Sequence, residues 1–165
     1  ISPMIVPLII TAAGMFFFYS KIGLTHTYLG LILAHTALGT PFVVITVTAT
    51  LTGFDTNLIR ASQSLGADTM RTFFKVIMPL ILPGVISGAL FAFITSFDEV
   101  VVVMFVGSVE QITIPKQMWA GLRQETSPVI LCMATCLVFL SIALLTTVEL
   151  LRRRSERLRG IKLQN

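Results

Sequence analysis

Two adjacent carboxylates, Asp98 and Glu99, follow a stretch at residues 76–97 that carries no charged residue. A carboxylate is costly inside hydrocarbon, so acids within a membrane span are candidates for function. Two such groups attract and pair with ammonium groups, and a small polycationic solute is the ligand that they fit. Thr95 and Ser96 each stand three residues before one of the acids, and we expect their hydroxyls to hydrogen-bond to the carboxylates along a helix.

The same two acids allow a second interpretation. If the span begins near Leu80, Asp98 lies roughly 27 Å along the helix axis, close to the outer edge of a hydrocarbon core about 30 Å thick. There the pair would form a gate, a structural contact or a contact with an extracytoplasmic protein. A transport assay of Asp98→Asn and Glu99→Gln separates a solute pathway from these roles.

A second pattern lies over residues 54–79. Its first half has the i, i+3, i+4, i+7 spacing of one helix face, at Leu58, Ala61, Ser62 and Leu65. Gly66 then interrupts the pattern, and Asp68 can cap a second helix, because its carboxylate accepts from free backbone N–H groups of the first turn. The second half repeats the spacing at Met70, Phe73, Phe74 and Ile77. We expect two amphipathic helices at a glycine turn, with an apolar stripe that fits a protein groove or lipid headgroups.

The elements that position these residues are predicted from apolar stretches. Of the 165 residues, 55% are hydrophobic and 12% charged, whereas soluble domains carry about 25% charged residues. A membrane-crossing helix needs about 20 mainly apolar residues, and the stretches are too long and uniform for barrel strands. The sequence predicts an all-α membrane protein, a helical bundle with about four transmembrane helices, at residues 1–19, 28–51, 80–106 and 128–151.

The basic residues orient this bundle. Nine of the twelve lie in the loop at 52–79 and in the tail at 152–165, and the other three are Lys21, Lys116 and Arg123. The positive-inside rule therefore predicts that the loop and the tail are cytoplasmic. A basic tail directly after a span is typical of an anchor to lipid headgroups, so we expect no nucleic-acid partner.

Other residues carry no sign of catalysis. The sequence holds no G-x-x-x-x-G-K-[ST], H-E-x-x-H or G-x-S-x-G motif and no metal-ligand cluster, so no catalytic residue, metal or cofactor is expected. Cys132 and Cys136 are expected to be small buried residues, and His35 a hydrogen-bonded packing residue rather than a ligand. Gly84 and Gly88 form a small-xxx-small pair, which predicts close helix packing.

The loop at 54–79 resembles the signature of importer permeases of the ATP-binding-cassette class. That signature is a Glu-Ala-Ala triplet, a Gly four residues after the second Ala, and a Leu-Pro pair thirteen residues beyond the Gly. Ala61, Gly66 and Pro79 match in spacing. Ser62 is a small replacement and Met78 replaces Leu, whereas Arg60 stands where the family has Glu. The segments 33–44, 88–93 and 96–101 are similar to the same family, and the spermidine/putrescine branch is the most similar.

The resemblance implies a non-catalytic subunit whose loop docks in a groove of an ATPase subunit. The loop residues implied are Leu58, Arg60, Ala61, Ser62, Leu65, Gly66, Ala67, Phe73, Phe74, Val76, Met78 and Pro79, and Pro79 is expected to stop the docking helix at a fixed angle to the span. The implied partners are two ATPase subunits, a second permease subunit, an extracytoplasmic substrate-binding protein and the lipid bilayer.

The resemblance also implies the setting of the chain. Residues 1–151 would be a partial permease transmembrane domain of a bacterial cytoplasmic (inner) membrane, with further spans before Ile1 and the C-terminus in the cytoplasm. The implied solute is a polyamine, putrescine or spermidine. Two alternatives stay open: an importer of the same architecture for ferric iron, thiamine or an opine-like compound, and a membrane scaffold that transports nothing.

Overall fold

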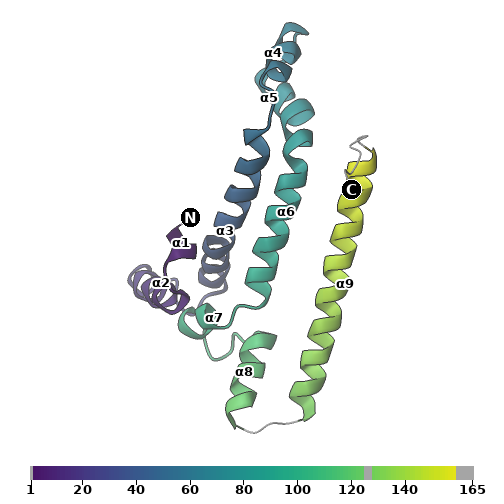
Figure 1. The fold of residues 1–165 in the computed structure, drawn as a ribbon. Helices are drawn as coiled ribbons and strands as arrows, with labels where there is room; N and C mark the ends of the chain where they lie inside the picture. The colour runs from purple at the N-terminus through teal and green to yellow at the C-terminus, as the bar shows by residue number, and fades with distance from the viewer. Residues whose placement is uncertain (1, 125–127, 159–165) are drawn as a thin grey trace.

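A computed structural model describes residues 2–124 and 128–158, and these residues form helices and connecting turns without any strand (Figure 1). The prediction of an all-α protein is therefore confirmed. The elements are α1 (Ser2–Ile5), α2 (Leu8–Ile22), α3 (Tyr28–Thr52), α4 (Asn57–Ser64), α5 (Thr69–Thr72), the π-helical turn η1 (Phe73–Ile77), α6 (Met78–Phe97), α7 (Val101–Val106), α8 (Ile114–Gln124) and α9 (Pro128–Leu158).

Three of the described helices are long and apolar enough to cross a membrane, and they cover Tyr28–Thr52, Thr69–Phe97 and Pro128–Thr147. The prediction of a single first span at 1–19 is wrong, because the chain breaks between α1 and α2. Pro7 has extended backbone there, with φ −52° and ψ 133°, and the residue before a proline is disfavoured in helical conformation. The 15 residues of α2 give a helix of about 22 Å.

The third predicted span, at 80–106, differs from the structure at both ends. Its helix begins at Thr69, because α5, η1 and α6 are continuous, and it ends at Phe97. The prediction that Pro79 stops the docking helix is wrong, because Pro79 lies inside the continuous helix Thr69–Phe97. The turn η1 explains this, because the N–H of Met78 donates to the oxygen of Phe73, five residues earlier. Such a widened turn shifts the carbonyls that a proline ring would otherwise meet.

Helix α9 extends past the predicted end of the fourth span at 151 and reaches Leu158. The predicted basic tail at 152–165 therefore begins within this helix, and its residues 159–165 lie outside the described residues. None of the apolar stretch Pro128–Thr147 is buried. The expectation of buried cysteines is wrong for the same reason, because Cys132 and Cys136 are exposed on α9.

The long helices α3 and α6 run side by side along most of their length (Figure 1). Their contact depends on small residues: a Cβ at Gly88 would lie 2.7 Å from Cα of Val43, and one at Gly84 would lie 2.9 Å from the oxygen of Thr46. Neither position has room for a side chain, so the two helices approach closely. They form one hairpin that connects the two ends of the molecule.

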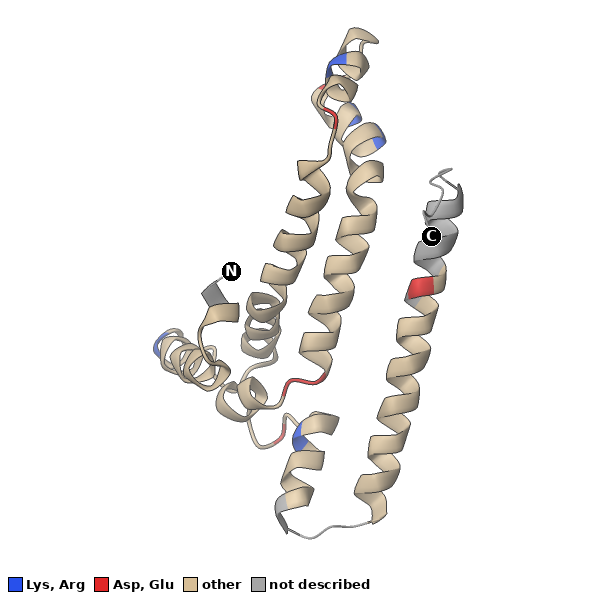
Figure 2. Ribbon diagram, viewed as in Figure 1, with Lys and Arg blue, Asp and Glu red and all other residues tan. Residues whose placement is uncertain are grey.

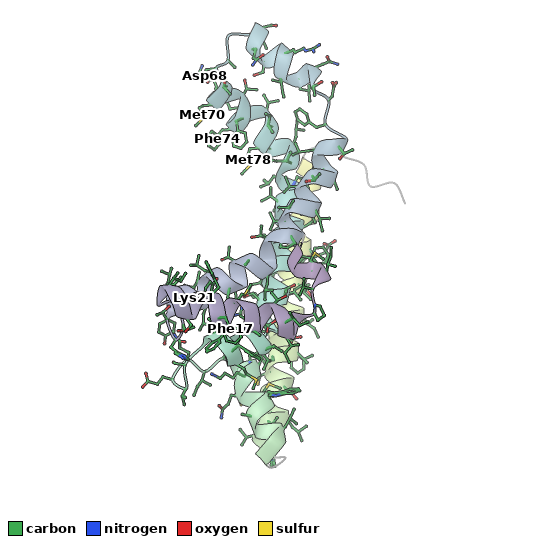
Figure 3. All side chains as sticks on the ribbon, turned by 90° about the vertical axis from the view of Figure 1, so that its left-hand side faces the viewer. Phe17, Lys21, Asp68, Met70, Phe74 and Met78 are labelled. Atoms are coloured by element: carbon green, nitrogen blue, oxygen red, sulfur yellow. The ribbon has the colours of Figure 1, made fainter. Side chains whose placement is uncertain are left out.

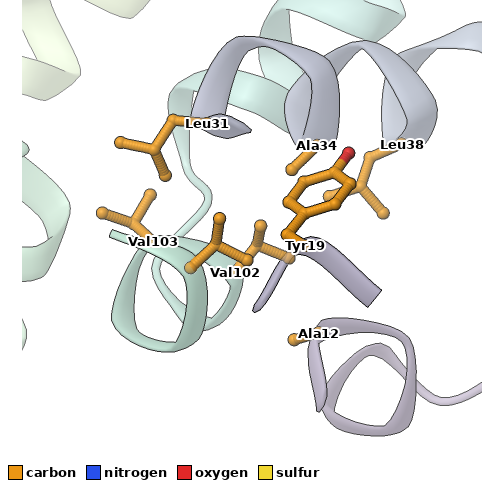
Figure 4. Close-up of a cluster of buried hydrophobic side chains, with 8 residues drawn as sticks. Ala12, Tyr19, Leu31, Ala34, Leu38, Val102 and Val103 are labelled. Atoms are coloured by element: carbon orange, nitrogen blue, oxygen red, sulfur yellow. The ribbon is translucent and has the colours of Figure 1, made fainter. Parts of the chain in front are cut away.

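A cluster of buried apolar side chains lies where α2, α3 and α7 meet (Figure 4). Its members are Ala12, Tyr19, Leu31, Ala34, Leu38, Val102, Val103 and Val106. Charged residues avoid this cluster and the middle of the long helices. They lie in the region of α4, α5 and η1, between α6 and α7 and between α7 and α8, with charged positions also on α2, α8 and α9 (Figure 2).

Candidate functional site

The segment before α6, residues 54–77, is called the head below, and it turns sharply at Gly66. The φ of Gly66 is +81°, a region that other residues adopt at a cost. Two backbone hydrogen bonds close the turn. The N–H of Gly66 donates to the carbonyl oxygen of Gln63 at 2.9 Å, and the N–H of Ala67 donates to the carbonyl oxygen of Ser62 at 3.1 Å. This pairing is the Schellman motif that ends a helix. No atom lies within 4 Å of a Cβ at Gly66, so the backbone, not packing, requires glycine there.

Two carboxylates of the head cap the N-termini of its helices. Oδ1 of Asp68 accepts from the N–H of Arg71 at 2.7 Å, which confirms the predicted cap of the second helix. Oδ1 of Asp55 accepts from the N–H of Asn57 at 2.9 Å. Both carboxylates satisfy N–H groups that have no partner within a helix, so the head is a defined helix–turn–helix.

One side-chain hydrogen bond joins the two helices of the head. Oγ of Ser62 lies 2.9 Å from Oγ1 of Thr72, and Thr72 is only 2% exposed. The sequence reasoning noted Ser62 as a small residue and missed Thr72. No periodicity connects residues ten positions apart across a turn, so no local pattern in the sequence pointed to this pair.

The apolar side chains of the head face outward. Leu65 is 88% exposed and Met70 65%, and Figure 3 shows Met70 and Phe74 along the left edge of the head. The rings of Phe73 and Phe74 meet edge to face at 5.1 Å. The other predicted loop residues divide by exposure: Leu58, Arg60 and Ala61 are exposed, and Ser62, Ala67, Val76, Met78 and Pro79 are half-buried.

At the far end of α6, Asp98 and Glu99 lie in different surroundings. Asp98 is exposed and Glu99 is 6% exposed. Oε1 of Glu99 accepts from the N–H of Val102 at 2.8 Å, which satisfies a free donor in the first turn of α7. The acids therefore stand in a break between two helices, called the 98–100 break below, and not inside a continuous span.

The hydroxyls predicted to bond the acids bind elsewhere. Oγ1 of Thr95 donates to the oxygen of Phe91 at 2.9 Å, and Oγ of Ser96 lies 2.8 Å from Nδ1 of His35. The expectation for Thr95 and Ser96 is wrong, because the helix ends before the acids can share its face. The structure instead makes Ser96 a link to α3, and His35 has the hydrogen bond expected of it.

Two cavities flank α6, and the two acids line different ones. Asp98 lines a cavity of about 890 Å³ between α6, α8 and α9 that is almost wholly apolar. Glu99 and Ser96 line one of about 1030 Å³ beside α3, together with His35 and Glu110. The structure thus separates the pair that the sequence reasoning treated as one site, and it adds Glu110. Among the described residues no group of three or more His, Cys, Asp or Glu could hold a metal ion.

Comparison with known proteins gives one family and several relatives. The profile of the family described as binding-protein-dependent transport system inner membrane component matches residues 1–158. The chain is 32% identical over 152 residues to the spermidine/putrescine transport system permease protein PotC of Haemophilus influenzae, which covers 92% of this chain and 59% of that protein. It is 31% identical over 150 residues to PotC of Escherichia coli K12, covering 91% of this chain and 57% of the relative.

A third relative is the putrescine transport system permease protein PotI of Escherichia coli K12. It is 28% identical over 145 residues, which cover 83% of this chain and 51% of PotI. The chain therefore spans between half and three-fifths of the length of these curated relatives.

Proposed function

The chain belongs to the family of binding-protein-dependent transport system inner membrane components, and we propose that it is part of the permease subunit of an ATP-driven polyamine importer. In this proposal it forms half of the solute pathway, beside a second permease subunit. A soluble binding protein delivers the solute from outside. The relatives named for spermidine and putrescine transport support the choice of solute.

The observation that carries this proposal is the head. Its turn is fixed by Gly66 and the Asp68 cap, yet its apolar side chains are exposed. An exposed apolar patch on a defined scaffold is typical of a surface that binds a protein. The head is also continuous with a long apolar helix, Thr69–Phe97, so a movement of the head is passed directly to that helix.

The energy is expected to come from a partner. The sequence has no phosphate-binding loop, and we assign ATP hydrolysis to two ATPase subunits that receive the head in a groove. The membrane is then the bacterial cytoplasmic membrane, crossed several times by the complete subunit. The excess of basic residues in the loop and the tail favours a cytoplasmic position for the head and the C-terminus.

The 98–100 break is the part of the proposed pathway that meets a cation. Asp98 is exposed beside Phe97 and Trp119, which line the same cavity, and a carboxylate next to aromatic rings attracts ammonium groups. Glu99 already satisfies the N–H of Val102. We therefore assign the contact with the solute to Asp98 and a positioning role to Glu99 and Ser96. A gate at the outer surface is the alternative role for the same residues.

The test is uptake competition in the reconstituted complete transporter. Putrescine and spermidine should compete for uptake, and an anionic solute should not. Competition by ferric iron or thiamine instead would indicate the same architecture with another solute. An absence of solute-stimulated ATP hydrolysis would indicate a scaffold and contradict the proposal. Asp98→Asn should lower putrescine uptake more than Glu99→Gln, and unchanged uptake in both variants would remove the acids from the pathway.

A further inference from the structure

The head carries positive charge as well as an apolar face. Its two acids, Asp55 and Asp68, each hold a helix start through a backbone N–H, where the positive end of the helix dipole offsets part of their charge. Its cations have no such partner. They are exposed and make no ion pair within the part of the chain that the structure describes, and they are Arg60, Arg71 and Lys75.

The cations lie close to the exposed apolar residues in the sequence. Arg71 and Lys75 are four residues apart, the spacing that places side chains on one side of a helix, and each directly follows an exposed apolar residue, Met70 or Phe74. Arg60 lies across the glycine turn, on α4. Figure 2 shows these basic positions on both arms of the head. Exposed cations and exposed apolar side chains therefore occur together on both arms of the head.

The position of the head favours a protein over the lipid surface as the partner. Helices that lie on a membrane run in its plane. The second arm of the head instead continues the long helix Thr69–Phe97, and in both views the head projects beyond the end of α3 (Figures 1 and 3). The 25 residues of α3 measure about 37 Å, already more than the hydrocarbon thickness of about 30 Å.

We propose that the ATPase groove that receives the head is acidic at its rim, with carboxylates opposite Arg60 and opposite Arg71 and Lys75. This inference rests on the proposed function and adds the chemistry of the partner. The apolar side chains supply most of the affinity of such an interface. The charges at its rim speed association and select the partner. Cations on both arms also fix the direction in which the head enters the groove.

The experiment measures how much ATPase subunit remains bound to the complete transporter, purified at low and at high salt. Arg60→Glu should lower the affinity for the ATPase subunit about fivefold at low salt and weaken its salt dependence. Arg60→Lys keeps the charge and should restore binding. Lys75→Glu tests the other arm and should have a similar effect. Lys21→Glu is the matched control, because Lys21 is an exposed cation on α2, outside the head, and it should change nothing.

The outcomes separate the two proposals. Equal ATPase binding by the original protein and Arg60→Glu at low salt overturns the acidic rim and leaves the proposed function intact. No ATPase binding by the original protein at any salt concentration overturns the proposed function itself. If Arg60→Glu fails to reach the membrane fraction, Arg60→Gln replaces it and should lower affinity about twofold.

A further experiment with lipid vesicles tests whether the cations of the head bind lipid headgroups instead of the ATPase subunit. The same variants are reconstituted in vesicles of phosphatidylcholine alone and with added phosphatidylglycerol. A loss of ATPase binding that persists in the neutral vesicles supports an acidic protein surface. A loss that occurs only in the anionic vesicles shows that the cations bind lipid headgroups, and it overturns the inference.

Discussion

Two of the charged turns between the described helices, residues 65–68 in the head and the 98–100 break, differ in what covers their side chains. In the head, Gly66 faces open space and Leu65 is almost fully exposed. At the 98–100 break, Glu99 is buried, and α7 after it contributes three valines to the buried cluster. The described chain leaves the apolar side chains of the first turn exposed, and it covers those that follow the second turn.

The difference shows that one local device can serve two purposes. Asp68 and Glu99 both accept from a backbone N–H in the first turn of the following helix. The exposed Asp68 caps a helix whose apolar side chains Met70 and Phe74 are exposed. The buried Glu99 caps α7, which packs against α2 and α3, and a lost bond costs more there because water cannot replace it. The predictions below test this contrast.

The largest effect is expected at the turn of the head. Gly66→Asp places a side chain at a φ of +81°, which costs roughly 1–2 kcal/mol, and adds an acid to the proposed docking surface. The variant should reach the membrane but bind the ATPase subunits poorly. Putrescine uptake should then fall about tenfold or more, while ATP hydrolysis by the ATPase subunits continues. Uptake and ATP hydrolysis are measured together in vesicles.

Two control variants separate the effect of the added charge from the effect of the positive φ at Gly66. Gly53→Asp adds the same charge to the same end of the molecule, at an ordinary φ of −90° and with no atom near its Cβ, and it should transport normally. Gly66→Asn lacks the charge and tolerates positive φ better, so it should retain more uptake. Normal transport by Gly66→Asp would show that the head needs no fixed turn.

The second largest effect is expected on the stability of the hairpin formed by α3 and α6. Gly88→Ala would bring a methyl group within 2.7 Å of Cα of Val43, and a clash with backbone costs about 1–3 kcal/mol because the helices must separate. Thermal unfolding of the complete permease in detergent should show a lower midpoint. Gly14→Ala has open space around its Cβ and should leave the midpoint unchanged or raise it. An unchanged midpoint in both would mean that α3 and α6 do not pack this closely.

The third effect separates the two acids of the 98–100 break. Glu99→Ala removes the buried acceptor of Val102 and should lower the free energy of unfolding by about 1–2 kcal/mol. Glu99→Gln keeps an acceptor oxygen and should be close to the original protein. Asp98→Ala, at an exposed position, should change stability by less than about 0.5 kcal/mol. Equal destabilisation by Asp98→Ala and Glu99→Ala in a thermal scan would contradict the different roles assigned to them.

The head could be predicted from the sequence because its signals are local. Gly66 is a helix stop signal after the first apolar pattern, and Asp68 is a helix start signal before the second, only two residues later. The 98–100 break was missed because residues 100–106 are again apolar, so the apolar stretch extends across the acids. Hydropathy describes composition, whereas the break depends on a hydrogen bond from the backbone of Val102 to Glu99.

Two further differences depend on structure that no short pattern encodes. The expectation that Pro79 ends a helix follows from its missing N–H, but the bond from Met78 to Phe73 in η1 lets the helix pass it. The separation of Asp98 and Glu99 into two cavities follows from packing against α3 on one side and α9 on the other. Asp98 and Glu99 are adjacent in the sequence, but they line cavities beside different helices.

The smallest predicted effect lies in the bond between Ser62 and Thr72. Ser62→Ala removes one partner and leaves the hydroxyl of Thr72 in a site only 2% exposed, which should cost about 1 kcal/mol. Ser62→Ala with Thr72→Val removes both partners and should recover most of this loss. The control Ser64→Ala removes an exposed hydroxyl that bonds only to its own helix.

The readout that distinguishes docking from folding is the amount of putrescine taken up per ATP hydrolysed. This ratio should fall in Ser62→Ala, because α4 and α5 then change their mutual angle more freely, and it should recover in the double variant. If the head were covered by its own chain, as the 98–100 break is, Ser62→Ala would lower thermal stability and leave this ratio unchanged. That result would remove the contrast between the two turns, because both would then be structural.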